Sequence, residues 1–77
     1  MPRAPSSERA AQVSPPLSPR QLEILRLLNA GVRAHAIAEQ LGLSETTVRN
    51  HIREILRRLD CHSQLEAVAC ARRHGLV

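Results

Sequence analysis

The sequence contains no phenylalanine, tryptophan, tyrosine or lysine. Without aromatic rings its core must be built from leucine, isoleucine, valine and alanine, which suits closely packed helices and suits a sheet poorly. The lack of aromatics also removes the platforms on which single-stranded bases stack. All eleven basic residues are arginine, and the net charge of +4 favours an anionic partner, either nucleic acid or a membrane surface.

Long apolar runs are also missing. No stretch approaches the ~20 apolar residues of a transmembrane helix, and the N-terminus lacks the apolar run of a signal peptide. We therefore expect a cytoplasmic protein with no membrane partner. Its two cysteines, Cys61 and Cys70, are too few for a disulfide framework and should be reduced there. A chain of 77 residues without a nucleophile motif is not expected to be an enzyme or to need a cofactor.

The first sixteen residues differ in composition from the rest. Residues 1–16 hold four of the five prolines and show no hydrophobic period, so a disordered tail or linker is predicted there. Order is expected to begin at Leu17, because Ser18, Pro19 and Gln21 make a helix start with a capping box. Residues 17–77 are then predicted to form one domain.

Start and stop signals predict an all-α fold, a four-helix bundle that contains a helix-turn-helix. Helices are expected over residues 19–30, 34–41, 45–59 and 64–74. Gly31 should end the first helix in a left-handed conformation, and Gly42 supplies the tight turn before the third. Ser44 caps the third helix, while Ser63 with Glu66 makes another capping box that opens the fourth.

Residues 45–59 form a two-faced helix when they are placed at 100° intervals. The apolar stripe consists of Val48, Ile52, Ile55 and Leu59, with Leu56 at its edge. A separate sector of about 100° carries Thr46, Arg49, Asn50, Arg53 and Arg57. A merely solvated face could look similar, but the short helix and glycine turn before it make a helix-turn-helix. Arginine and asparagine also form bidentate hydrogen bonds with guanine and adenine in a major groove.

The sequence from Leu17 to Val77 resembles the helix-turn-helix domain of the LuxR/GerE family, which bacterial response regulators and quorum-sensing activators carry. The matching segments are LSPRQLEILRLLNAG, IAEQLGLSETTVRNHIREILRRL and HSQLEAVACARRHGLV. The resemblance implies sequence-specific binding of double-stranded DNA in transcription regulation, with the third helix in the major groove. RNA polymerase is implied as a further partner.

The resemblance also implies roles for individual residues. Base reading is assigned to Arg49, Asn50 and Arg53. Phosphate contacts, which position a domain without reading sequence, are assigned to Thr47 and His51, with Thr46 and Arg57 as helpers. The family's common glycine after the third helix is Asp60 here, so this helix could end differently.

The fourth predicted helix has more small apolar positions than one core contact requires. Leu65 and Val68 are expected to dock it on the other helices. The remaining stripe, spaced i, i+3, i+4 and i+7, consists of Ala67, Cys70, Ala71 and His74. Its small side chains would let a partner helix approach closely, so we expect a homodimer that assembles on DNA with repeated half-sites. The alternative is that these alanines pack against the first helix.

Two other interpretations remain open. The promoter-recognition domain of sigma factors has similar Leu-Ser and Thr-Val spacing, but it ends soon after the recognition helix, whereas this chain continues. A metal or redox-sensing module is suggested by Cys61, His62, Cys70 and His74, since Cys70 and His74 share one helical face. A free cysteine commonly behaves as a small buried hydrophobe, so no metal site is predicted.

Overall fold

The computed structural model describes residues 17–77, which form four helices joined by short loops. The helices are α2 (Pro19–Asn29), α3 (Ala34–Leu41), α4 (Glu45–Leu59) and α5 (Gln64–Arg73). The all-α prediction is confirmed, and each helix agrees with its predicted bounds to within one residue. The predicted tail at residues 1–16 lies outside the described residues.

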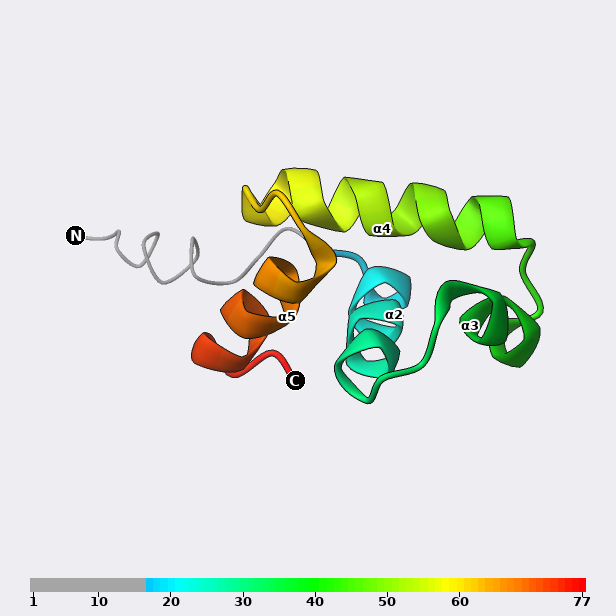
Figure 1. Cartoon of the computed structure of the whole chain (residues 1–77), viewed down its shortest axis with the longest axis horizontal. Coiled ribbons are helices and arrows are strands. Elements are labelled where there is room, and N and C mark those ends of the chain that lie inside the picture. Colours follow the sequence, from blue (N-terminus) through cyan, green and yellow to red (C-terminus); the bar gives the residue numbers. More distant parts are fainter. Residues whose placement is uncertain (1–16) are drawn as a thin grey trace.

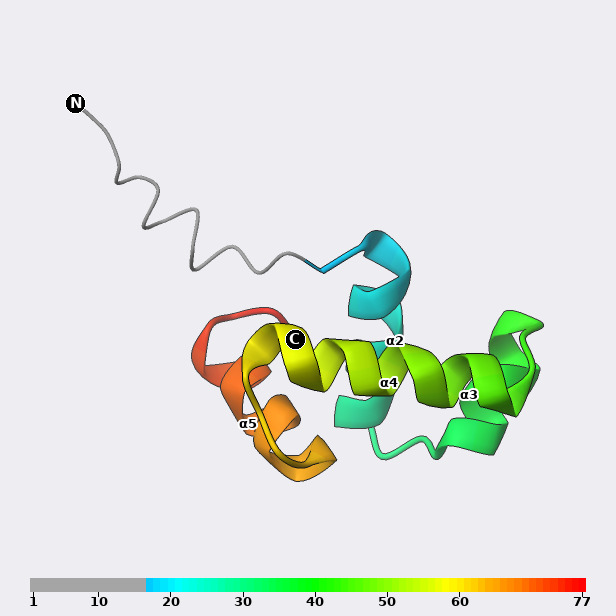
Figure 2. The same cartoon turned by 90° about the horizontal axis from the view of Figure 1, so that it is seen from above.

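α4 is the helix that organises the domain. It runs along the long axis, and α5, α2 and α3 lie side by side against one of its faces (Figure 1). Seen from above, α4 crosses over α2, and no described helix covers its outer side (Figure 2). α3 and α4 are joined at Gly42, whose left-handed φ of 69° ends α3 and turns the chain into α4. These two helices therefore form a helix-turn-helix with one open helix face.

Side-chain caps explain where three of the helices begin. Ser18 and Gln21 make the predicted capping box, in which the Ser18 hydroxyl accepts from the Gln21 backbone N–H at 3.1 Å. Ser44 caps α4 by accepting from the Thr47 backbone N–H at 3.0 Å. The box predicted at the start of α5 is only half formed. Ser63 accepts from the Glu66 backbone N–H, but the Glu66 carboxylate accepts from the N–H of His62, at 2.6 Å.

The C-terminal end of α4 has an unusual backbone conformation. Asp60 ends the helix with φ 56° and ψ 46°, and it is the only non-glycine residue with positive φ among residues 17–77. The helix therefore ends in the left-handed geometry that glycine adopts freely, although an aspartate occupies the position. Asparagine and aspartate tolerate this region better than other side chains, yet the conformation still costs free energy.

The predicted apolar stripe of α4 lies in the core. Val48 and Ile55 are fully buried, and they pack with Ile24 and Leu25 of α2 and with Ile37 of α3. These five side chains are the largest fully buried ones in the described chain, and they join α2 to the two helices of the helix-turn-helix. Since the inner face of α4 is thus committed to packing, its outer face is held in a defined orientation.

The packing of α5 contradicts one prediction. Ala67 and Ala71 are 1% and 0% exposed, and Ala71 belongs to the main core cluster. Leu65, which was expected to dock the helix, is 82% exposed instead. The alanines themselves dock α5, because their methyl side chains let it approach α2 and α4 closely. The predicted dimer stripe is therefore wrong at Ala67 and Ala71, which pack in the core as the alternative held, whereas half-buried Cys70 and exposed His74 reach the surface.

Candidate nucleic-acid interface

The outer face of α4 presents the polar sector that the helical spacing predicts. Its exposed members are Thr46, Arg49, Asn50, Arg53 and Arg57, whereas Thr47 and His51 are half-buried at the edge nearer α2. A regular helix of fifteen residues holds all of them at fixed spacing, and its inner face is locked in the core. The structure thus brings the predicted base-reading and phosphate-binding residues onto one continuous surface.

Each arginine of this surface has a partner on the same helix. Arg49 donates to the Glu45 carboxylate, with a shortest distance of 2.6 Å. The Arg53 guanidinium donates to the amide oxygen of Asn50 at 2.9 Å. These contacts span three or four residues and lie in solvent, so each pair adds little to stability and opens readily. The guanidinium groups are therefore held along the helix without being withdrawn from an approaching ligand.

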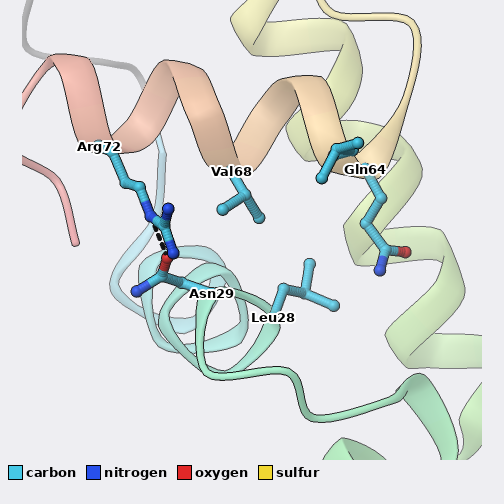
Figure 3. Close-up of a pocket in the computed structure, with 6 residues that line it drawn as sticks. Leu28, Asn29, Gln64, Val68 and Arg72 are labelled. Atoms are coloured by element: carbon cyan, nitrogen blue, oxygen red, sulfur yellow. Dashed lines mark hydrogen bonds between the residues drawn. The ribbon is translucent and has the colours of Figure 1, made fainter.

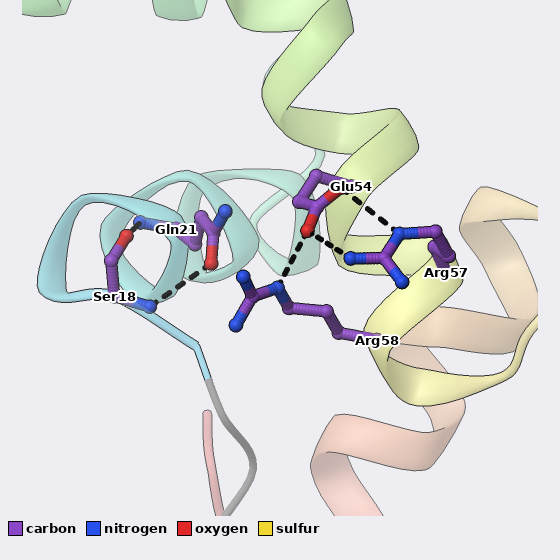
Figure 4. Close-up of polar contacts among 5 residues, drawn as sticks. All are labelled: Ser18, Gln21, Glu54, Arg57 and Arg58. Atoms are coloured by element: carbon purple, nitrogen blue, oxygen red, sulfur yellow. Dashed lines mark hydrogen bonds and ion pairs between the residues drawn. The ribbon is translucent and has the colours of Figure 1, made fainter.

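Glu54 is the carboxylate at the centre of the second half of α4. Arg57 donates to it through two nitrogens, at 2.5 and 3.1 Å, and Arg58 donates at 2.7 Å. Figure 4 shows the Glu54 side chain between the two guanidinium groups. Hydrogen bonds from Arg57 and then Arg58 lower the pKa of Glu54 from 4.5 to about 2. The same contact raises the pKa of Arg57, so Glu54 and Arg57 form a charged pair at neutral pH.

A shallow hollow of about 290 Å³ separates the first turn of α2 from the outer face of α4. It is lined by Gln21, Thr47, Asn50, His51 and Glu54. Sequence reasoning missed the part that Gln21 and Glu54 play here. Gln21 was identified only as a capping residue, yet it is 7% exposed and forms the wall opposite α4. For Glu54 the available signal was its charge, since it is the only acidic residue of α4 after Glu45.

The exposed part of α5 forms a second surface at some distance along the domain. A hollow between α2 and α5 is lined by Leu28, Asn29, Gln64, Leu65, Val68 and Arg72. Arg72 donates to the Asn29 side-chain oxygen at 2.7 Å and closes one end of it (Figure 3). Leu65 is the only large hydrophobic side chain that is mostly exposed among residues 17–77. The exposed Leu65 thus lies at a hollow lined by three apolar and three polar side chains.

The cysteine and histidine set is only partly brought together. The Cys61 thiol lies near Cys70, and it donates to the Leu59 carbonyl oxygen at 3.5 Å. Burial, followed by the neighbouring Cys70, raises the pKa of the Cys61 thiol. In the part of the chain that the structure describes, no three His, Cys, Asp or Glu side chains are placed to share a metal ion. No helix among these residues is long and apolar enough to cross a membrane.

Comparison with known proteins agrees with this arrangement. The sequence profile of the luxR family of bacterial regulatory proteins matches residues 15–71. The transcriptional regulatory protein YxjL of Bacillus subtilis is 36% identical over 75 residues, which is 97% of this chain and 34% of YxjL. The transcriptional activator RamA of Corynebacterium glutamicum is 37% identical over 59 residues, or 77% of this chain and 21% of RamA. The chain thus spans about a third or less of these relatives.

Two solved structures have the same fold. The transcription factor GerE superposes with a TM-score of 0.75 at 35% identity, covering 78% of this chain and 90% of GerE. The response regulator ChrA of a heme-sensing two-component system superposes with a TM-score of 0.76 at 32% identity, covering 94% of this chain and 37% of ChrA. The family profile reaches residue 71, well into α5, which favours the LuxR family over the sigma-factor interpretation. The chain belongs to the LuxR family of bacterial regulatory proteins.

Proposed function

We propose that this domain binds double-stranded DNA sequence-specifically in bacterial transcription regulation, with α4 in the major groove. The observation that carries the proposal is the outer face of α4, where Arg49, Asn50 and Arg53 are exposed on a helix whose other face is fixed in the core. A single α-helix fits the width of the major groove, and these side chain types match guanine and adenine edges. Related regulators, including RamA and GerE, are named as transcription factors, which supports the same role here.

The outer face of α4 would make two kinds of contact with DNA, to base edges and to phosphates. Arg49, Asn50 and Arg53 read base edges, since they lie along the exposed ridge of α4. Phosphates are bound by Thr47 and His51 on the side facing α2, and by Thr46 and Arg57 near the two ends of α4. On binding, each arginine exchanges its carboxylate or amide partner for a base or a phosphate.

The domain acts as a homodimer on repeated half-sites, because one recognition helix covers few base pairs. We place the contact on the exposed side of α5, where Leu65 and Val68 border the hollow against Leu28 of α2. This surface is small, so the free protein is expected to be mostly monomeric and to pair on DNA. Cys70 and His74 lie on the same helix but flank the buried alanines, which makes them at most peripheral.

Location and further partners follow from this role. A regulator that binds the bacterial chromosome works in the cytoplasm, and RNA polymerase is the partner through which its binding would change transcription. Nothing in the proposed DNA contact requires a cofactor, a metal ion or a catalytic residue, because hydrogen bonds and charge supply the whole interaction.

The test is site selection from random duplex DNA by the wild-type domain and by two arginine variants. Arg49→Ala should cost about 1–3 kcal/mol at the selected site and relax the preference at one base position, because a bidentate contact is lost. Arg26→Ala is the matched control, since Arg26 is exposed on α2 and its loss removes the same charge. If both variants select the same site as the wild type, α4 does not read bases through Arg49.

A further inference from the structure

Glu54 stands out on the proposed DNA-binding surface because its charge has the wrong sign. It is the only acidic residue of α4 after Glu45, and it lines the hollow beside Asn50 and His51. An isolated carboxylate in this position would meet the phosphates of a bound duplex and repel them. The effect of Glu54 on DNA binding therefore depends on the side chains with which it pairs.

The contacts of Glu54 involve two guanidinium groups at once. Arg57 places two nitrogens on the carboxylate, and Arg58 adds a third hydrogen bond at 2.7 Å (Figure 4). The planar fork of an arginine binds a carboxylate and a phosphate with the same bidentate geometry. Glu54 thus forms the same bidentate contact with Arg57 that a DNA phosphate would form.

Pairing with Glu54 reduces the free energy that Arg57 gains from contact with a DNA phosphate. A guanidinium that is already paired must give up that pair before it gains a phosphate, so the net gain per phosphate contact is smaller. Binding to DNA of arbitrary sequence depends almost wholly on phosphate contacts, whereas binding to a target site also includes base contacts. A carboxylate that competes for Arg57 therefore weakens the phosphate contact on DNA of any sequence, while base reading through Arg49 and Arg53 at the target is left intact.

We propose that Glu54 is an internal competitor for DNA phosphate, which pairs with Arg57 and Arg58 and thereby limits binding to non-target DNA. This inference rests on the proposed function, and it adds a residue that limits occupancy of non-target DNA without contacting a base. The exposed position of the Arg57 pair permits the exchange, because neither group has to leave a buried site. Phosphate contacts weaken equally on target and random sequence, but only target binding retains base contacts, so occupancy of random sequence is lost first as salt rises.

The experiment measures binding of a random-sequence duplex as a function of salt concentration. Glu54→Gln should raise affinity at low salt by about fivefold, the upper range for an exposed ion pair. The negative log-log salt slope should steepen by ~0.9 for each additional phosphate neutralised. Glu23→Gln is the matched control, because Glu23 forms an exposed pair with Arg20 at 3.4 Å on α2 and its substitution changes the net charge equally.

A second comparison separates pairing from simple charge. Glu54→Gln is repeated in a background that carries Arg57→Gln and Arg58→Gln, where little gain should remain because the arginines for which Glu54 and phosphate compete are gone. An equal gain in both backgrounds, or an effect no larger than that of Glu23→Gln, would overturn the proposal. So would a loss of target binding in Glu54→Gln, which would instead make Glu54 a base-reading acceptor for cytosine. If the wild type itself binds no duplex, the proposed function fails rather than this inference.

Discussion

Leu65→Ala tests the proposed dimer surface most sharply, because this side chain contributes very little to the stability of the isolated domain. Leu65 is 82% exposed, so its truncation should change the free energy of unfolding by less than about 0.5 kcal/mol. In a dimer the same side chain would be buried against the partner. Removing its isopropyl group would then cost about 2 kcal/mol per copy, at ~0.8 kcal/mol for each buried CH₂.

Both copies contribute to a symmetric contact, so the cooperative free energy should fall by about 4 kcal/mol, or roughly a thousandfold in the coupling constant. The assay compares binding to a duplex with two half-sites and to a duplex with one. Leu65→Ala should lose cooperativity on the first and keep its affinity for the second. Arg73→Ala, elsewhere on the exposed part of α5, is the control that should retain both. Unchanged cooperativity in Leu65→Ala would refute the assigned surface.

Three further predictions concern stability and reactivity. Asp60→Gly should raise the free energy of unfolding by about 0.5–1 kcal/mol in urea titrations, because glycine removes the strain of positive φ; a decrease would contradict that strain. Since the pKa of Glu54 falls from 4.5 to about 2, its stabilising contribution is present above pH 4.5 and lost towards pH 2; wild-type melting temperature should drop through this range more than that of Glu54→Gln. Cys61 should react with iodoacetamide more slowly at pH 8–9 than an unperturbed thiol, given its raised pKa; equal rates would be inconsistent with its burial.

Most of the fold is readable from the sequence because its helix boundaries depend on local chemistry. Ser18, Ser44 and Ser63 accept from backbone N–H groups at the three capped helix starts, and Gly42 turns between α3 and α4. Such signals act within three or four residues and need no knowledge of tertiary packing. The orientation of α4 is equally predictable, since its apolar and polar residues are separated around the helix.

The surface of α5 could not be predicted in this way. Its small residues suit close packing equally well against α2 and α4 or against a second copy, and periodicity does not distinguish these partners. Ala67 and Ala71 fill the core, whereas Leu65, the larger hydrophobe, points outwards. The sharing of Glu54 between Arg57 and Arg58 depends on side-chain rotamers, which spacing permits but does not specify.

The central claim is that α4 reads base edges in the major groove, and one substitution in the DNA tests it directly. In the selected binding site, each guanine is replaced in turn by 7-deazaguanine, which lacks the N7 acceptor but keeps its Watson–Crick pairing. The account predicts that affinity falls several-fold at one or two guanines, where Arg49 or Arg53 makes its bidentate contact. It also predicts that Arg49→Ala is insensitive to one of those replacements. Wild-type affinity that is unchanged at every guanine of the selected site would contradict the claim.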